Sequence, residues 1–430
     1  MKTFSIKNQL WKWFYPGIRI KRYLLLVIFG ILLLVSGLIF CLDIENFILI
    51  KDNLKGIFNF PDSFLNISGI TIGTIGIGFI ILGIRNLNRS IFKAVIPKQA
   101  DRISELIYQK ARLNKGPKIV VIGGGTGLYV LLRGLKTYTN NITAVVTVFD
   151  TGGSSGRLRK ELGVLPPGDI RNCLVALATA EPLMERLFQY RFSNGSLEGH
   201  SFGNLFISAM SEVSGDFINA IEKSSEILAI QGRVLPSSLE NVTLFAKMKD
   251  GETIRGESEI TGSRKIIEKV YLEPSDISPL PETLKALKEA EIIILGPGSL
   301  YTSVICNLLV KGMPKAISES QAIKVYVCNI MTQLGETDSF TASHHLKNLE
   351  KYLGSNCIDY LIVNTAKINS NLKEKYALED AYQVAVDKSE ILEMGVNLIS
   401  EELWCNQNLA RHDSNKLAQV IIDLISERKV

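Results

Sequence analysis

Residues 123–172 contain three glycine-rich loops whose backbone and side chains could bind phosphate. The first reads Gly123-Gly124-Gly125-Thr126-Gly127, the second extends from Asp150 to Arg157, and the third from Pro166 to Asn172. Glycine adopts positive φ angles and lets a ligand approach the backbone, and consecutive backbone N–H groups at such turns form a concave anion site. A helix N-terminus after the loop strengthens that site. The sequence therefore predicts a phosphate-bearing ligand, most simply a nucleotide.

The first loop lies between an apolar run and a helical pattern, which is the context of the dinucleotide-binding fingerprint. Leu128 stands where the third glycine of that fingerprint belongs, so a tight structural turn is the alternative. Asp150 ends the next apolar run, where an acid can bind a ribose or cap a turn. The guanidinium of Arg157 matches phosphate oxygens, and Asp169 is expected to cap the helix that follows it. The ligand-binding residues expected from these loops are Gly123, Gly124, Gly125, Thr126, Gly127, Asp150, Gly152, Gly153, Ser154, Ser155, Arg157, Asp169, Arg171 and Asn172.

The second loop also contains Gly152-Gly153-Ser154-Ser155-Gly156, which fits the GxSxG pattern of the nucleophile elbow in α/β hydrolases. That interpretation requires a strand, an elbow and a helix, with an acid and a histidine downstream. The neighbouring Arg157 and Arg159 suit an anion site better. We therefore favour phosphate binding over hydrolysis for this loop.

Three further loops carry glycine, hydroxyl or amide groups. The turn Gly199–Asn204 opens a helix, Leu295–Ser303 has the order strand, glycine turn, helix, and Asn329–Asp338 follows an apolar strand. Ligands of open α/β sheets bind beyond the carboxyl ends of the strands, so these loops are expected to complete one ligand cleft. Their expected ligand-binding residues are His200, Ser201, Asn204, Gly296, Gly298, Ser299, Tyr301, Asn329, Thr332, Gln333 and Glu336.

Strand-like and helical patterns alternate through residues 117–430 and predict an α/β domain with a Rossmann-like, mainly parallel sheet covered by helices. A change of pattern near 233–274, with a hairpin signal at Asp250-Gly251, predicts a small antiparallel β insert. The expected strands are 118–122, 142–149, 291–295, 324–328 and 359–363. The expected helices include 127–135, 169–178, 182–192, 281–290, 341–353 and 414–427, and the stretch 202–230 is expected to be helical in pieces.

Two long uncharged runs predict a transmembrane hairpin within residues 1–87, with spans of about 23–42 and 64–84. Basic residues precede the first run and follow the second, whereas the loop between the runs is richer in acids. The positive-inside rule then predicts a two-pass protein of the cell membrane with both termini and the main domain in the cytoplasm. A basic linker, about 88–116, precedes the domain. Gly69 and Gly73 form a GxxxG pair, which can contact a neighbouring helix.

Composition argues against several other functions. The net charge of +5 includes the basic membrane flanks and forms no stripe with interleaved aromatic residues, so we expect no nucleic-acid partner. The six cysteines are scattered without metal-type spacing, so we expect free thiols and no metal site. The adjacent His344 and His345 point apart on a helix and are expected to be exposed.

Taken together, these motifs resemble those of the YvcK-like gluconeogenesis factor family, a branch of the CofD-like superfamily. The matching stretches lie within residues 118–345 and read GGGTGLYVLLRGLK, GGSSGRLRKELG, PPGDIRN, GHSFGNL, GPGSLYTSV and NIMTQLGETD. GGSSGRLR with PPGDIRN favours the YvcK-like branch over the phospholactyl-transferase branch. Two positions depart from the family pattern, because Thr151 replaces a usual second acid and Cys306 replaces a usual proline.

The resemblance implies a cytoplasmic domain that binds nucleotide sugars such as UDP-glucose or UDP-N-acetylglucosamine, with no required cofactor. It also implies a role in growth on gluconeogenic carbon and in cell shape; the candidate partners are a second copy of the chain and envelope-synthesis proteins. The alternative is a CofD-like transferase that uses a nucleotide-diphosphate-activated small acid or sugar. Mg²⁺ would be needed only for that reaction, and Thr151 weakens the case for it. Asp150, Asp169 and His200 are the candidate catalytic groups, and because no catalytic dyad or triad is visible we favour binding without turnover.

Overall fold

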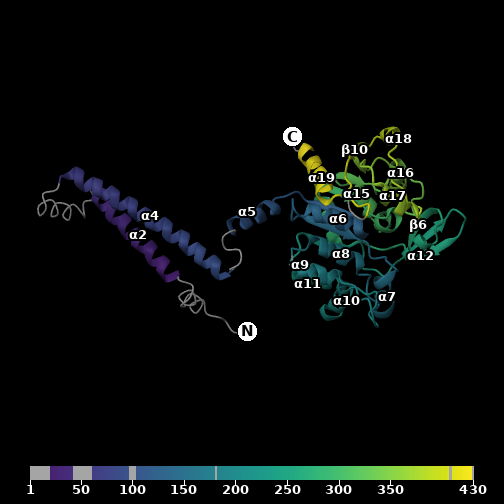
Figure 1. Cartoon of the computed structure of the whole chain (residues 1–430), viewed down its shortest axis with the longest axis horizontal. Helices are drawn as coiled ribbons and strands as arrows, with labels where there is room; N and C mark the ends of the chain where they lie inside the picture. The colour runs from purple at the N-terminus through teal and green to yellow at the C-terminus, as the bar shows by residue number, and fades with distance from the viewer. Residues whose placement is uncertain (1–19, 42–60, 96–102, 180–181, 406–408, 429–430) are drawn as a thin grey trace. The chain divides into compact units, whose positions relative to one another are not determined.

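The computed structural model describes residues 20–41, 61–95, 103–179, 182–405 and 409–428 (Figure 1). The chain divides into two compact units, Met1–Lys110 and Ala111–Val430. Residues 1–19 and 42–60, which carry much of the charge pattern used for the topology, lie outside the described residues.

The first unit contains two long apolar helices, α2 (Ile20–Cys41) and α4 (Asp62–Val95), which pack against each other. Within them, Ile20–Cys41 and Asn66–Ile91 are long and apolar enough to cross a membrane, by length and composition. The second of these segments continues beyond the span expected from the sequence. A shorter helix, α5 (Ile103–Asn114), extends across the boundary between the units.

Glycines set the close approach of α2 and α4. A Cβ atom on Gly37 would lie 2.5 Å from the Gly69 carbonyl oxygen and 2.6 Å from the Gly73 backbone nitrogen. One on Gly30 would lie 2.8 Å from the Gly76 carbonyl oxygen. Small residues that let backbones touch are typical of helix packing in membranes. The GxxxG pair that the sequence indicated therefore lies at this helix–helix contact.

A seven-stranded sheet forms the centre of the second unit, with the strand order β10-β9-β8-β7-β1-β2-β3. All neighbouring strands in it are parallel. The strand order reverses between β1 and β7, and such a switch point is where doubly wound sheets bind their ligands. The predicted Rossmann-like fold is confirmed. The strands are β1 (Ile119–Gly123), β2 (Ile142–Val146), β3 (Arg233–Pro236), β7 (Ile292–Leu295), β8 (Ile323–Val327), β9 (Tyr360–Asn364) and β10 (Asn397–Glu401).

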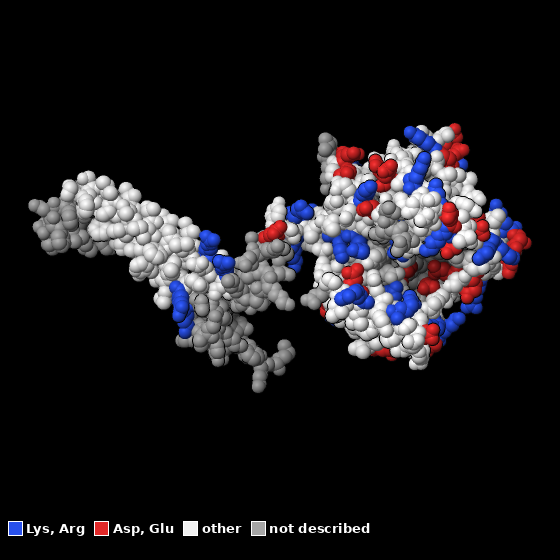
Figure 2. Space-filling view, in the orientation of Figure 1, with Lys and Arg blue, Asp and Glu red and all other residues white. Residues whose placement is uncertain are grey.

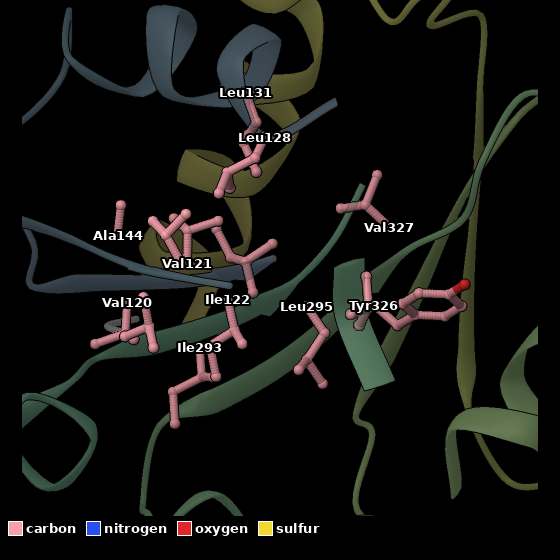
Figure 3. Packing of buried hydrophobic residues seen from close by; sticks show 14 of the residues in the cluster. Val120, Val121, Ile122, Leu128, Leu131, Ala144, Ile293, Leu295, Tyr326 and Val327 are labelled. Carbon is pink, nitrogen blue, oxygen red and sulfur yellow. The ribbon is translucent and has the colours of Figure 1, made fainter. Parts of the chain in front are cut away.

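The central strands are apolar because helices cover both of their faces. Every residue of β1 and β7 is buried. Figure 3 shows Leu128 and Leu131 of helix α6 (Gly125–Leu135) pointing toward Val121 of β1. Burying one such side chain contributes roughly 1.5–3 kcal/mol. This core therefore holds the ends of β1 and β7, and the loops that follow them, in fixed positions.

Two groups of helices pack on the sheet. Helix α6 contacts α8 and α19, and α8 contacts α11; separately, α15 contacts α13 and α16. Right-handed crossovers on either side of the switch point place two such groups on opposite faces of the sheet. Outside the small antiparallel sheet, the other helices described in this unit are α7 (Gly153–Leu162), α8 (Gly168–Leu177), α9 (Pro182–Gln189), α10 (Phe202–Ser214), α11 (Phe217–Leu228), α13 (Pro281–Glu289), the π-helical turn η3 (Leu300–Ile305), α14 (Cys306–Leu308), α15 (Met313–Ser318), α16 (Ala342–Leu353), α17 (Ser370–Ala377), α18 (Lys388–Glu393) and α19 (Ser414–Arg428).

The small antiparallel sheet has the order β5-β4-β6 and includes a short helix between β5 and β6. Its elements are β4 (Thr243–Met248), β5 (Thr253–Arg255), α12 (Glu257–Gly262) and β6 (Ile267–Glu273). The expected start of this insert near residue 233 is wrong, because β3 pairs with β2 in parallel and belongs to the main sheet. The turn expected at Asp250-Gly251 is present, with a φ of 91° at Gly251.

The helical stretch expected in pieces over 202–230 is confirmed as two helices, because Gly215 adopts a φ of 89° and Asp216 caps the next helix by accepting a hydrogen bond from Asn219 N. One local expectation is corrected. His345 is buried rather than exposed, and its Nδ1 lies 2.9 Å from the Thr341 carbonyl oxygen. Burial lowers the pKa of His345 to about 4.

Candidate functional site

The loops that follow β1 and β7 meet at the switch point. A Cβ atom on Gly127 would lie 2.5 Å from the Pro297 carbonyl oxygen, and one on Gly298 would lie 3.1 Å from the Gly124 carbonyl oxygen. Glycine at 127 is therefore required by the contact between the two loops, and Gly298 packs tightly against the first loop. This close contact brings the N-terminus of α6 beside the loop after β7.

Gly125 differs from these two glycines because it faces open space. Its φ is 66°, and the nearest neighbour of a Cβ atom there would be Ser303 Oγ at 3.8 Å. A ligand can therefore approach the backbone at this position. Gly124 is extended, but a Cβ atom on it would collide with Asp169 Oδ2, so the first loop rests directly on a carboxyl group.

A cavity of about 290 Å³ lies between these loops. The segment after β8 forms another wall of this switch-point cavity, and Tyr376, Arg411 and His412 from the C-terminal part of the chain also line it. Burial lowers the pKa of His412 to about 4, which keeps this imidazole neutral near pH 7. Residues that the sequence predicted and that line this cavity are Gly125, Thr126, Gly127, Gly298, Ser299, Asn329, Thr332 and Gln333.

Hydrogen bonds join the loop after β7 to the segment after β8. The Asn329 side chain donates to the Gly298 carbonyl oxygen at 2.8 Å and accepts from Gly298 N at 3.1 Å. Ser299 Oγ donates to Gln333 Oε1 at 2.6 Å. Thr332 is anchored in turn by the backbone N–H of Tyr382, which donates to its Oγ1 at 2.9 Å. The cavity wall is thus held by paired polar groups.

Glu336 also joins the loop after β7 to the segment after β8 through hydrogen bonds. It is 3% exposed and accepts hydrogen bonds from Tyr301 N at 3.2 Å and from Thr302 Oγ1 at 2.9 Å. Thr261 Oγ1 and Gln333 Nε2 each donate to Glu336 Oε1 at 3.3 Å. Burial raises the pKa of Glu336, while the donors of Thr302, Tyr301 and Thr261 act to lower it. Glu336 therefore supports the loops and joins the β insert to them.

A separate cluster of hydrogen-bonded polar side chains includes Ser154 of α7. Ser154 Oγ is 3.0 Å from His200 Nδ1 and accepts from Asn204 Nδ2 at 3.1 Å. Arg171 donates to Ser201 Oγ at 2.5 Å and to the Asn172 side chain at 2.7 Å. Ser154 does touch a histidine, as the hydrolase alternative requires. It lies inside α7, however, rather than at an elbow directly after a strand.

Arg157, expected to bind phosphate, is exposed, and its Nη2 donates to the Glu198 carbonyl oxygen at 2.7 Å. Arg159 on the same helix is more buried and donates to the Val242 carbonyl oxygen at 2.6 Å. Burial lowers the pKa of Arg159, and the nearby Arg255 lowers it further. The arginines of this segment thus contact neighbouring loops of the protein.

Asp169 lies within α8 rather than at its cap, because the helix begins at Gly168 and Pro167 is its cap residue. The expected capping role is therefore wrong. The carboxyl instead lies against the first glycine loop at Gly124, and polar interactions with the Gly125 backbone and the Asn172 side chain act to lower its pKa. Burial raises the pKa of Asp169 from 3.8 to about 6, with repulsion from Asp150 in the same direction.

Other acids lie near this group. Burial raises the pKa of Asp150. Burial also raises the pKa of Glu257 strongly, and repulsion from Asp150, Asp169 and Glu336 raises the pKa of Glu257 further. Figure 2 shows acidic side chains gathered in a hollow near α12. Asp150 Oδ1 also accepts a hydrogen bond from Gly152 N at 2.7 Å. Asp150 therefore caps the turn that it begins. The glycine loops therefore adjoin a group of carboxyls that favour protons or cations.

Several residues of this region were not predicted from the sequence. Glu257 lies in the β insert, far along the chain from the glycine loops, and Tyr376 and Arg411 lie in segments without a motif. Thr151, at one departure from the family pattern, donates to Glu259 Oε2 at 3.1 Å. Cys306, at the other, is buried with its Sγ 3.5 Å from Thr147 Oγ1. Only the folded sheet brings these residues to one edge.

The doubly wound sheet and its paired glycine loops define a Rossmann-like α/β protein, and known proteins share both. The family described as 2-phospho-L-lactate transferase CofD matches residues 119–404. The "Gluconeogenesis factor" of Bacillus subtilis is 48% identical over 317 residues, covering 73% of this chain and 100% of that protein. The "Putative gluconeogenesis factor" of Clostridium acetobutylicum is 43% identical over 433 residues, covering 97% of this chain and 92% of that protein.

A crystal structure of a UPF0052 family member from Bacillus halodurans has a TM-score of 0.69 and 49% sequence identity, covering 71% of this chain and 99% of that chain. The chain therefore belongs to the CofD family. Its relatives are gluconeogenesis factors, which is the branch that the sequence motifs predicted. Because the B. halodurans structure has about the size of the α/β unit, that unit exists as a protein of its own among the relatives.

Proposed function

We propose that the α/β unit binds a nucleotide sugar in the switch-point cavity and acts as a regulator attached to the membrane. The observation that carries the proposal is the meeting of two glycine loops around this cavity of about 290 Å³. Backbone N–H groups near Gly125 and the guanidinium of Arg411 suit the oxygens of a diphosphate. Cavities of roughly this size and larger hold small-molecule ligands.

The regulatory part of the proposal draws on the relatives, which are named for gluconeogenesis. A protein that binds a nucleotide sugar without converting it reports the supply of that sugar to carbon metabolism and to assembly of the cell envelope. The two apolar helices support attachment of this sensor to the membrane where envelope precursors are used.

Isothermal calorimetry tests the binding. The full-length protein in detergent, and the fragment 111–430, are titrated with UDP-glucose and UDP-N-acetylglucosamine without metal. We expect both preparations to bind, and the affinity to fall as salt rises, because salt screens the attraction between the phosphates and the guanidinium of Arg411. Absence of binding to any nucleotide sugar would refute the proposal.

Cysteine labelling tests the attachment and its direction. A cysteine placed in the segment 43–63 should react with an impermeant reagent applied from outside intact cells, whereas one near residue 115 should react only after lysis. Replacing the native cysteines first removes the background. Labelling of both positions from outside would refute the cytoplasmic placement of the α/β unit.

A CofD-like transferase is the second candidate, favoured by the family match and by the acids beside the glycine loops. Among the described residues, no three His, Cys, Asp or Glu side chains are grouped to hold a metal ion. Mg²⁺ commonly takes only one or two carboxylates together with substrate phosphates, and Asp150 and Asp169 could supply these. Mg²⁺-dependent release of a nucleotide product from a nucleotide sugar, and its loss in Asp150→Asn, would favour this candidate.

A further inference from the structure

A second cavity, of about 710 Å³, adjoins the switch-point cavity. Thr332, Gln333 and Tyr376 line both cavities, so these residues form a wall that the two cavities share. Helix α12 of the β insert forms another wall, through residues that include Ser258 and Thr261. The second cavity has the size of pockets that bind small molecules.

The two cavities differ in their charged and polar groups. The described residues around the switch-point cavity include Arg411 but no carboxylate. The second cavity is lined by Glu257 and Glu379, by the hydroxyl-bearing Ser258 and Thr261, and by Arg264. Guanidinium and N–H groups suit phosphate oxygens, whereas carboxylates and hydroxyls suit the hydroxyl groups of a sugar. Both cavities carry hydroxyl groups and a guanidinium, so the carboxyls of the second cavity are the feature that favours the sugar hydroxyls there.

Other features of the second cavity suit a sugar ring. Leu378 is 88% exposed and lies at this cavity beside Tyr376, which gives the apolar C–H face of a sugar a surface to contact. Glu257 Oε2 is buried without a hydrogen-bond partner among the described residues. Buried polar atoms are nearly always hydrogen-bonded, so a rotation of the Glu257 side chain toward a ligand hydroxyl in the cavity would give this oxygen a partner.

The wall between the insert and the loops is held in place before any ligand binds. Gly335 has a φ of 81°, and a Cβ atom on it would lie 2.6 Å from the Thr261 carbonyl oxygen. Thr261 Oγ1 donates to Glu336, which also accepts from Gln333. A preformed wall lowers the entropy cost of binding.

We propose that the second cavity binds the sugar ring of the nucleotide sugar, while the nucleoside diphosphate lies in the switch-point cavity. The inference rests on the proposed function and deepens it. It gives the β insert a role in selecting the sugar, because Glu257, Ser258 and Thr261 all belong to α12.

The experiment fills the second cavity. A Cβ atom on Gly262 meets nothing within 4 Å, and this residue lines the cavity, so phenylalanine can enter without a collision of its Cβ. Gly262→Ala is the matched control, because it makes the same backbone change without the ring. The full-length protein and both variants, in detergent, are titrated calorimetrically with UDP and with UDP-N-acetylglucosamine. Circular dichroism checks that each variant is folded.

We expect the unmodified protein to bind UDP-N-acetylglucosamine more tightly than UDP. Gly262→Phe should weaken binding of the sugar nucleotide about tenfold, roughly the effect of one lost hydrogen bond, and leave UDP binding unchanged. Gly262→Ala should change neither. If Gly262→Phe weakens UDP equally, the cavity holds the nucleoside and the inference is overturned; no loss for either ligand overturns it as well. Equal affinity of the unmodified protein for both ligands overturns the sugar cavity but leaves the nucleotide site standing, whereas binding of neither overturns the proposed function itself.

Discussion

Replacing Asp169 by asparagine tests whether the carboxyl beside the first glycine loop destabilises the fold. Burial raises the pKa of Asp169 from 3.8 to about 6, and Asp150 adds repulsion, whereas the Gly125 backbone, Arg171 and Asn172 act in the opposite direction. An acid whose pKa is higher in the folded state than in the unfolded state destabilises the folded state wherever it is charged. Asparagine keeps an oxygen that can accept from Gly125 but carries no charge.

The pKa sets the magnitude and the pH window. A rise from 3.8 to about 6 corresponds to about 3 kcal/mol, because one pKa unit is worth roughly 1.4 kcal/mol. Below about pH 4 the carboxyl is protonated in both states and the penalty vanishes; it grows from about pH 4 to 6 and is constant above. Because Asp169 keeps some exposure, we expect Asp169→Asn to raise the free energy of unfolding by about 2 kcal/mol at pH 7.5. Near pH 4 the gain should be about 0.5 kcal/mol or less.

Urea denaturation of the fragment 111–430, followed by circular dichroism at both pH values, measures this difference. The control is Asp276→Asn, since Asp276 forms an exposed ion pair with Lys311 at 2.6 Å and its loss should cost below about 1 kcal/mol. A gain of the same size at pH 4 and pH 7.5 would refute the role of charge. A loss of stability at pH 7.5 would refute the reasoning altogether, because it would show that the charged carboxyl is stabilised by its neighbours.

Three further changes test other parts of the chain. Gly125→Val should abolish nucleotide-sugar binding and cost about 1–3 kcal/mol of stability, because its φ is 66°; calorimetry showing unchanged affinity would assign the loop a structural role only. Glu336→Ala should lower the free energy of unfolding by about 3 kcal/mol or more, because several buried donors lose their acceptor, and Glu336→Gln should recover part of the melting temperature. Gly37→Val should reduce the protease resistance of the α2–α4 pair in detergent, whereas Gly78→Val, where a Cβ atom meets nothing within 4 Å, should not; equal resistance contradicts the glycine contact.

Five strands of the main sheet and its mainly parallel character could be predicted because these strands are short apolar runs that alternate with helical patterns. β1 and β7 are buried on both faces, and such strands are recognisable as continuous apolar segments. β3 was assigned to the insert because it has only four residues, ends in Pro236 and has an exposed first residue. Its pairing with β2 depends on a long crossover, which local patterns do not reveal.

The candidate site could be predicted only where a loop contains its own ligand-binding groups. Gly125 and Gly298 were expected at the cavity and line it. Asp169 was expected at a helix cap because its neighbours in sequence suggest one, whereas its environment is set by Gly124 and Gly125 of another loop. Glu257 had no local pattern at all, because only the packing of the insert brings it to the acids.

The acids beside the glycine loops impose a condition on any anionic ligand. A diphosphate bound near Gly125 would repel Asp169 and its acidic neighbours when they are charged, so binding requires that they take up protons or that a cation lies between. With a pKa of about 6, Asp169 takes up a proton near neutral pH at a small cost in free energy. The two proposed functions therefore separate in one measurement. A metal-free binding protein binds more tightly as the pH falls toward 6, whereas a transferase that places Mg²⁺ between phosphate and carboxylates binds with metal and loses affinity as these acids are protonated.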